Sequence, residues 1–355
     1  MSEARAEFNH TWRSFNPQPY RPETGLPIRG FLLLLLSTGL TGVLVGLLAG
    51  IIGQWLYVVI LFPILMGAIV GHAGAWAVDR GRVRSPLLGG LVGILGGCAA
   101  VIALHGIEYC VFEYQLREVP PEVRQIARDF EKLQPQFATL PPDVQFVILQ
   151  LREDPEARET LAVHSLWTYI DRRAREGVEL RDVGDNGAKA GLNLGYIGSY
   201  CYWSVDFLLI ALIAAEMIRK AAARPFCSRC DEWKTETVLP AFPGSPLVIC
   251  DAFESGDFRS IANHVASPGD AETFLATLFH CPRCTTESAL DVRLAQLIVK
   301  KKGEPTEKLV CELSYPGEAR ESLEQAIVQS IRATVAAQTR EAQSAADAES
   351  VTSQT

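Results

Sequence analysis

The sequence predicts a membrane α-helical protein with a four-helix transmembrane bundle, a small external helical domain and a cytoplasmic α+β domain. Three observations carry this prediction. Four stretches of the 355-residue chain are apolar over 21 residues or more in our reading of the sequence, and about 20 are needed to cross a bilayer. Small residues recur in each stretch at four-residue spacing. Two Cys-x-x-Cys pairs then follow the last stretch.

The first three apolar stretches fall within residues 31–112 and the fourth within residues 191–220. None of the first three contains Asp, Glu, Lys or Arg, as a span through hydrocarbon requires. A tight turn at Gly53 and Gln54 would join the first two. The predicted helices are Phe31–Ile52, Trp55–Val78, Leu87–Ile107 and Leu192–Met217.

Small residues four apart lie on one face of a helix and let two helix backbones approach closely where lipid removes the hydrophobic drive to associate. The sequence therefore predicts helix-packing faces, and these faces could also support a homo-oligomer. The glycines on them are Gly42, Gly46, Gly50, Gly67, Gly71, Gly89, Gly93, Gly97, Gly191 and Gly195.

Lysine and arginine set the predicted orientation. Basic residues precede the first helix, fill the loop between the second and third, and follow the fourth; they include Arg29, Arg80, Arg82, Arg84, Arg219 and Lys220. Alternating spans place these clusters on one side, which the positive-inside rule makes cytoplasmic. Both termini are then expected inside the cell and residues 113–190 outside.

The polar segments around the spans divide into an arm and an external domain. Residues 1–30 contain four prolines and are predicted to be a flexible arm. In residues 113–190, Pro120-Pro121 and Pro141-Pro142 mark two similar helix starts, and a third helix is expected over 155–176. These helices could cap the external mouth of the bundle or form a solvated spacer.

The two Cys-x-x-Cys pairs indicate a metal site. Cys227 and Cys230 form the first pair, and Cys281 and Cys284 form the second. Four thiolates are the tetrahedral set of structural zinc, and they leave no coordination position open for a substrate. Free thiols or a redox pair are the alternative. Cys250 and Cys311 are expected to pack as small core residues, and His280, next to Cys281, is expected to be a neighbour rather than a ligand.

The domain that contains this site is predicted to span residues 221–335. Strands are expected in 236–250, a short helix in 269–279 and a β-hairpin formed by 289–299 and 309–315. A helix over 323–335 would follow. Residues 336–355 are rich in Ala, Gln, Ser and Glu and are predicted to be a disordered tail.

The motif over residues 225–316 resembles a split zinc ribbon, in which about 50 residues separate the two cysteine pairs. The glycine-rich first hairpin and the run from Gly195 to Trp203 resemble uncharacterised multi-pass bacterial membrane proteins. These resemblances imply a structural zinc ion and a location in the bacterial inner membrane. They imply no particular activity.

Asp206 is the candidate for chemistry within the membrane. An acid near the middle of a span costs roughly 2.5–3.5 kcal/mol on insertion scales, so such residues face the bundle and are often functional. His72 and His105 on neighbouring spans could join it to relay protons or bind a cation. The alternative is that Asp206 only fixes helix packing through a hydrogen bond.

Composition narrows the choice of function. The net charge of −8 gives no basic field to attract nucleic acid. The chain has no GxSxG, HExxH or phosphate-binding GxxxxGK[ST] motif. The leading hypothesis is a membrane-anchored interaction or regulatory protein that presents a zinc module to a cytoplasmic protein partner. The alternative is a small oligomeric transporter or channel subunit that uses Asp206, and an enzyme acting on lipid comes third.

Overall fold

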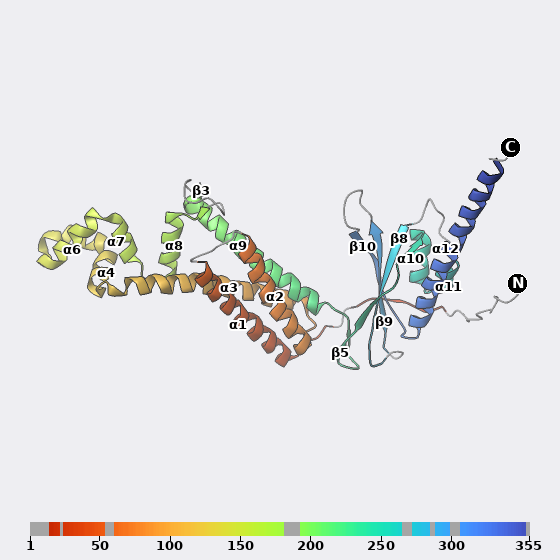
Figure 1. Ribbon diagram of the computed structural model, residues 1–355. Helices are drawn as coiled ribbons and strands as arrows, with labels where there is room; N and C mark the ends of the chain where they lie inside the picture. Colours follow the sequence, from red (N-terminus) through yellow and green to blue (C-terminus); the bar gives the residue numbers. More distant parts are fainter. Residues whose placement is uncertain are drawn as a thin grey trace. The chain divides into compact units, whose positions relative to one another are not determined.

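The computed structural model describes residues 14–21, 24–53, 60–180, 192–264, 272–284, 288–298 and 306–352, with few side chains after residue 340. The chain forms two compact units (Figure 1). One unit comprises residues 25–223 and contains the helical bundle. The other unites residues 1–24 with residues 224–355 and is called the C-terminal domain below.

Four helices of the first unit are long and apolar enough to cross a membrane, as the sequence predicted. They are α1 (Ile28–Ile52), α2 (Leu61–Gly81), α3 (Pro86–Gln115) and α9 (Gly195–Ala222). The predicted start of the second helix and its turn fall in residues 54–59, outside the described residues. Helix α3 continues past the predicted end at Ile107, where its polar side chains pair with one another: the Tyr109 hydroxyl donates to Glu113 at 3.1 Å.

The glycine strip of α1 packs on α3. A Cβ atom at Gly46 would lie 2.1 Å from the carbonyl oxygen of Ala100, and one at Gly42 would lie 2.4 Å from that of Gly96. Such distances leave no room for any side chain. The two backbones are therefore in direct contact, which is the arrangement that small-residue spacing predicts in a membrane bundle.

The strips on α2 and α3 both face α9. A Cβ atom at Gly67 would lie 2.9 Å from the carbonyl oxygen of Ile210. On α3, Gly93 lies against Ala215 of α9, and Gly97 lies against Ala211. Helix α3 thus packs against both α1 and α9. Because these strips contact helices of their own chain, a homo-oligomer would need another surface.

Of the predicted packing glycines, one lies outside the described residues and one does not act in this way. Gly191 lies outside the described residues. Gly195 begins α9 with φ of +64°, and a Cβ there would meet no atom within 4 Å. A positive φ is tolerated best by glycine, so Gly195 serves the turn into the helix rather than a helix interface.

The segment that the sequence predicts to be external forms two parts. Helices α4 (Pro121–Arg128), α5 (Phe130–Leu133), α6 (Pro142–Glu153) and α7 (Pro155–Ala162) surround a small core of Ala127, Phe130, Ile148 and Leu151. Two 3-10 turns, 116–118 and 134–139, complete this part. The helix starts predicted at Pro121 and Pro142 are confirmed.

The helix predicted over 155–176 is two helices, α7 and α8 (Leu166–Glu176). The break arises because Ser165 caps α8 in a capping box with Thr168, which favours a new helix start over continuation. Among the helices predicted to form a cap over the bundle, α8 packs against both α3 and α9. The short strands β2 (Glu179–Leu180) and β3 (Leu192–Asn193) pair beyond it, and the predicted loop 183–191 lies outside the described residues.

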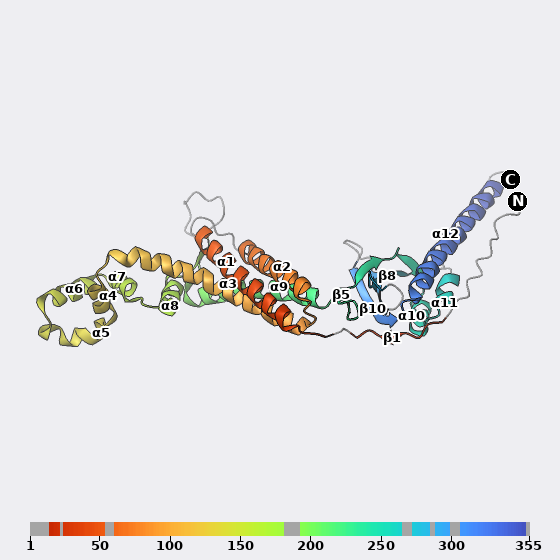
Figure 2. The same ribbon diagram turned by 90° about the horizontal axis from the view of Figure 1, so that it is seen from below.

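The C-terminal domain is built on an antiparallel sheet in the order β1-β10-β9-β8-β6, with β7 also pairing with β8. Helices α10 to α12 pack with it around one core that includes Phe242, Phe253, Phe274 and Leu323 (Figure 2). The strands are β1 (Gln18–Pro19), β6 (Thr235–Val238), β7 (Phe242–Gly244), β8 (Glu272–His280), β9 (Leu290–Ile298) and β10 (Thr306–Tyr315). The helices are α10 (Pro246–Ser255), α11 (Phe258–Asn263) and α12 (Ala319–Thr352).

The hairpin predicted after the second cysteine pair is confirmed, because β9 and β10 pair with Leu290 opposite Tyr315. One local prediction in this domain is wrong, and another holds only for β6 and β7. The helix expected over 269–279 is strand β8, and the strands expected over 236–250 give way to helix α10 at Pro246. Short apolar runs do not distinguish a strand from a buried helix by periodicity, and here pairing of β8 with β9 decides the outcome.

The N-terminal segment is not a free arm over residues 14–20. Phe15 is 9% exposed in the core of the C-terminal domain, and its N–H donates to the Gly256 carbonyl at 3.2 Å. Strand β1 pairs with β10, with Gln18 opposite Ser314. The prolines suit an edge strand, where a missing N–H costs no ladder bond, so the proline-rich composition did not mean flexibility.

The predicted disordered tail is largely helical, since α12 continues to Thr352. Alanine, glutamine and glutamate are all strong helix formers, and residues 336–352 are composed mostly of such residues and serine. The first half of α12 supplies buried Leu323, Ala326 and Ile327 to the core. A helix already anchored there needs no new nucleus to extend.

Candidate functional sites

Two turns of the C-terminal domain bring the four predicted metal-ligating cysteines together. The first turn lies between β4 (Phe226–Cys227) and β5 (Glu232–Trp233), whose pairing places Cys227 opposite Glu232. Asp231 closes this turn in the left-handed region at φ 54°. The second turn follows β8 directly and carries Cys281 and Cys284. The sheet therefore sets the distance between the two pairs.

The four sulfur atoms form one compact group, within 4.8 Å of one another. The Cys284 Sγ lies 3.6 Å from that of Cys227 and 3.2 Å from that of Cys230. A tetrahedral ion with metal–sulfur bonds of about 2.3 Å requires sulfurs roughly 3.8 Å apart. These distances lie within about 1 Å of that spacing, and the donor set of four thiols is chemically suited to such an ion.

The surroundings of the group favour the thiolate form of Cys281 and bury two of the four cysteines. Cys227 and Cys281 are buried. Burial alone would raise the pKa of Cys281, but backbone N–H groups of Cys284 and Arg283 donate to its sulfur, and with neighbouring thiols they lower the pKa to about 7. Arg283 also pairs with Glu232 at 2.7 Å and so ties one turn to the other. Aromatic packing of Phe226 on Trp233, with ring centroids 5.1 Å apart, covers the first turn.

The remaining thiols of the domain do not join this group. Cys311 packs against the domain core, where burial raises its pKa to about 12, and Cys250 is also partly buried. His280 is next to Cys281 in the chain but is not a member of the ligand group that the described residues form. The predicted core position is confirmed for Cys311, whereas Cys250 is only partly buried and His280 is the chain neighbour of Cys281.

A buried ion pair, which the sequence analysis did not predict, lies directly after the first cysteine turn. Lys234 Nζ is 2.6 Å from Asp291 Oδ2, with side-chain exposures of only 6% and 8%. Lys234 also donates to the Ala289 carbonyl at 2.8 Å, and Asp291 accepts from the Ser314 hydroxyl. The pair joins the metal-binding turn to β9 and β10. Sequence spacing of 57 residues carries no signal for such a contact.

Lys234→Met is expected to destabilise the C-terminal domain by about 3 kcal/mol, because breaking a buried pair leaves an uncompensated charge at Asp291. Native-state hydrogen exchange of the β9 amides in the full-length protein measures this free energy. Lys308→Met is the matched control, since Lys308 is an exposed lysine on β10 of the same sheet. Equal protection of β9 in the two variants would show that the pair contributes nothing.

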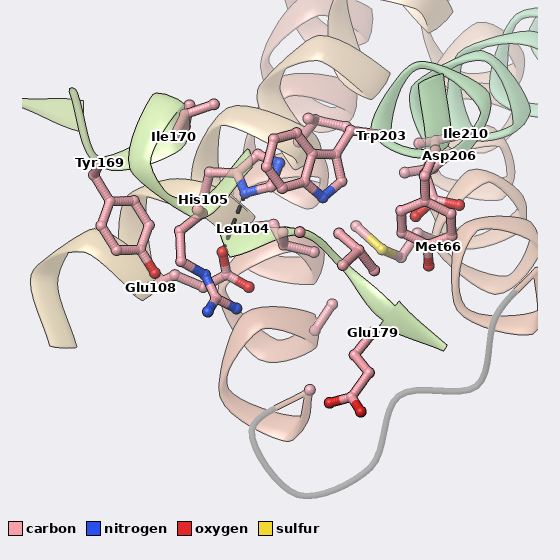
Figure 3. A pocket seen from close by; sticks show the side chains of 17 residues that line it. Met66, Leu104, His105, Glu108, Tyr169, Ile170, Glu179, Trp203, Asp206 and Ile210 are labelled. Atoms are coloured by element: carbon pink, nitrogen blue, oxygen red, sulfur yellow. Dashed lines mark hydrogen bonds and ion pairs between the residues drawn. The ribbon is translucent and has the colours of Figure 1, made fainter. Parts of the chain in front are cut away.

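The second candidate site is a cavity of about 530 Å³ in the bundle, at the end nearest α8 (Figure 3). Its lining comes from α1, α2, α3, α8, β2 and α9, so residues far apart in the sequence meet there. The polar lining residues are His105, Glu108, Arg173, Glu179, Tyr202 and Asp206. Apolar and aromatic residues, among them Met66, Tyr169, Trp203 and Ile210, complete the wall.

Asp206 and His105 both line this cavity, whereas His72 does not. His72 is exposed on the surface of α2. Of the two histidines that could join Asp206, only His105 is therefore among the described residues that line the cavity. Helical periodicity explains the difference: the packing face of α2 is fixed by Gly67, Gly71 and Gly74, and a residue next to Gly71 cannot share that face.

The outer part of the cavity is held by paired side chains. The His105 Nδ1 lies 3.1 Å from the Glu108 carboxylate, and the His105 ring meets the Trp203 ring edge-on with centroids 5.4 Å apart. Burial, with the nearby charge of Glu108, raises the pKa of Tyr169 to about 12. The phenol is therefore neutral at physiological pH and can act as a hydrogen-bond donor into the cavity.

Helix α8 and β2 are fixed over the bundle by hydrogen bonds to α9. The backbone N–H of Val178 donates to the buried Ser199 hydroxyl at 2.9 Å, and the Tyr196 hydroxyl donates to Asp171 at 2.7 Å. These contacts place Tyr169, Arg173 and Glu179 on the cavity wall. Tyr196 and Ser199, polar residues in the first half of α9, thus serve contacts to α8 and the segment after it.

Comparison with known proteins gives no assignment for either site. No family model matches the chain, and no curated protein or solved structure shows significant similarity to it. The resemblance of the cysteine motif to a zinc ribbon therefore rests on the four cysteines and their geometry alone. Function must be argued from the chemistry of the two sites.

Proposed function

We propose that the protein is a membrane-anchored interaction protein whose C-terminal domain, held together by a structural zinc ion, binds a protein partner in the cytoplasm. The observation that carries this proposal is the closed group of four cysteine sulfurs within 4.8 Å. Four thiolates occupy every position of a tetrahedral ion, so the site can stabilise a fold but cannot bind substrate.

Zinc is favoured over other metals by the ligand chemistry. Soft thiolates select zinc, Cu(I) or iron–sulfur clusters, and a tetrahedral set of four cysteines is typical of structural zinc sites. Two short turns at the edge of a small sheet match such a site. The turn-bridging pair of Arg283 and Glu232 would hold the two halves in register before the ion binds.

The cytoplasmic placement rests on the basic residues. Within the bundle, Gly30 at the start of α1 packs on Gly81 at the end of α2, and Gly89 near the start of α3 packs on Ile218 near the end of α9. These four helix ends therefore lie at one end of the bundle, and they carry the basic clusters. The positive-inside rule then supports a cytoplasmic position for that end and for the chain termini, in the inner membrane of a bacterium.

The test is affinity purification of the full-length protein from membranes, with mass spectrometry of what it retains. The wild type is compared with Cys227→Ser/Cys230→Ser, and the control is Cys110→Ser/Cys201→Ser, which removes two exposed bundle cysteines. A partner held by the wild type and the control but lost from the first variant, and rebound in purified form, supports the proposal. Retention of the same proteins by all three contradicts it.

A small transporter or channel is the second candidate, and the cavity beside Asp206 is the observation that favours it. An acid, an imidazole and a second acid in one cavity of a membrane bundle could move a proton. Under this candidate Asp206→Asn abolishes ion flux in liposomes. Under the leading proposal the same variant leaves partner binding intact.

A further inference from the structure

A buried tyrosine with an unbonded hydroxyl lines the bundle cavity. Tyr169 of α8 is 7% exposed, and no described residue makes a hydrogen bond with its hydroxyl. Its ring packs on those of Tyr109 and Phe112, with centroids 5.8 Å and 5.2 Å away, so the side chain is held in place. Buried tyrosines usually have a partner for the hydroxyl. A molecule in the cavity that accepts a hydrogen bond would supply one.

His105 offers a second polar group to the same cavity. Its side chain is 13% exposed, and its Nδ1 lies 3.1 Å from the Glu108 carboxylate (Figure 3). Because an ionised carboxylate only accepts, Nδ1 carries the proton, and Nε2 of the neutral ring is an acceptor. No residue in the described part of the chain is hydrogen-bonded to Nε2. Glu108 is also close enough to act on Tyr169 through its charge, so the hydroxyl and the imidazole are neighbours.

The charged residues of the described lining are already engaged. Arg173 lies 3.2 Å from Glu176, and Glu179 and Asp206 each interact with another residue. A ligand is therefore not needed to pair any of these charges. What remains for it is one hydroxyl donor and one imidazole acceptor, both neutral.

The wall around these two groups is apolar and aromatic. Ala49, Met66 and Ile210 are each 5% exposed or less and are called the apolar floor below. Trp203 also lines the cavity and meets the His105 ring edge-on, with centroids 5.4 Å apart. The volume of about 530 Å³ lies within the range of roughly 300–1,000 Å³ that is usual for small-molecule pockets, which combine such walls with a few polar groups.

We propose that this cavity binds a small neutral phenol, whose hydroxyl accepts a hydrogen bond from Tyr169 and donates one to His105. A hydroxyl suits both groups because it can donate and accept at once. The aromatic ring of the ligand lies against Trp203 and the apolar floor, since aromatic rings attract one another beyond the area they bury. A ketone would leave the imidazole unpaired, and a hydrocarbon would leave both groups unpaired. The inference goes beyond the proposed partner binding and does not depend on it.

The test is calorimetric titration of the detergent-purified full-length protein with 2-naphthol, corrected by titration into empty micelles. Two compounds of similar shape are compared with it. In 2-methoxynaphthalene the oxygen accepts but cannot donate, and 2-methylnaphthalene does neither. The expected result is saturable binding of 2-naphthol, about fivefold weaker binding of the methoxy compound and about 25-fold weaker binding of the methyl compound, at one hydrogen bond per step.

Two variants assign these hydrogen bonds to residues. Tyr169→Phe keeps the ring and should weaken binding of 2-naphthol and 2-methoxynaphthalene by about fivefold, with 2-methylnaphthalene unchanged. His105→Phe should weaken binding of 2-naphthol alone. Tyr109→Phe is the matched control, because it removes a hydroxyl that donates to Glu113 in the same aromatic cluster, outside the described lining. It should bind all three compounds as the wild type does.

Equal affinity of the wild type for the three compounds would overturn the proposal, since neither hydrogen bond would then contribute. So would failure of 2-naphthol to bind at millimolar concentration. A loss of 2-methylnaphthalene binding in Tyr169→Phe as large as the loss of 2-naphthol binding would show that the hydroxyl acts on structure alone, which also contradicts the proposal. Monodisperse elution shows that each variant is folded. If Tyr169→Phe is not, the wild type and His105→Phe still decide.

Discussion

Cys281→Ser is expected to unfold the C-terminal domain and to leave the helical bundle folded. Cys281 is fully buried and contributes one of four sulfurs to the metal group. Structural zinc sites supply about 10–16 kcal/mol of binding free energy in small domains, which is as large as the whole stability of a typical domain. Losing one thiolate removes most of that energy. It also leaves a hydroxyl buried among the remaining sulfurs.

Limited proteolysis of the full-length protein in membranes measures this effect. New cleavage is expected within residues 226–315, while the bundle fragment persists. Cys250→Ala is the matched control, because Cys250 is a partly buried thiol of the same domain outside the metal group. Its expected cost is about 1 kcal/mol, with no new cleavage. A Cys281→Ser protein as resistant as the wild type would show that the domain folds without the metal.

Gly46→Ala is expected to destabilise the bundle by about 3 kcal/mol or more. The new Cβ would lie 2.1 Å from the backbone oxygen of Ala100, and backbone cannot rotate away as a flexible side chain can. Helices α1 and α3 must therefore separate, and their contacts along the strip are lost. Thermal unfolding of the purified protein in detergent, followed by tryptophan fluorescence, measures the change.

Gly39→Ala is the control for this substitution, since a Cβ at Gly39 meets nothing within 4 Å and lies on the same helix. It should be neutral, or slightly stabilising because alanine favours helix. Equal effects of the two substitutions would mean that α1 and α3 do not make the close contact.

The parts of the fold that sequence predicted best depend on strong local constraints. Long uncharged stretches predict membrane-spanning helices because few other backbone structures satisfy their hydrogen bonds in hydrocarbon. All four predicted helices are present and are long and apolar enough to cross a membrane. The hairpin of β9 and β10 followed from its two apolar runs. The glycines of α1 lie on the face that their spacing predicted, although which helix they meet could not be known from the spacing alone.

The errors arise where tertiary contacts decide the structure. Residues 14–20 have a proline-rich, apparently flexible sequence, yet they join the sheet because Phe15 finds a place in a core formed by residues far along the chain. The sequence predicts a helix over 269–279, where strand β8 lies, because this apolar run is short and lacks clear alternation. The tail 336–352 is helical because α12 is anchored in that core.

The two sites differ in how much the sequence could predict. The cysteine pairs carry their chemistry in a local motif, so the four ligands were found and the structure brings them together. The cavity has no local motif. Asp206 was the one available signal, and it predicted neither the cavity nor the contribution of α8 and β2, because Tyr169, Arg173 and Glu179 reach it from another segment.

The metal content of the full-length protein decides whether the four cysteines hold a structural ion. The protein is purified in detergent without added metal or chelator, and its metals are quantified by mass spectrometry against protein concentration. One zinc ion per chain is expected in the wild type and in Cys250→Ala, and close to none in Cys281→Ser. A wild-type protein that holds no zinc, or zinc retained in full by Cys281→Ser, would contradict this expectation.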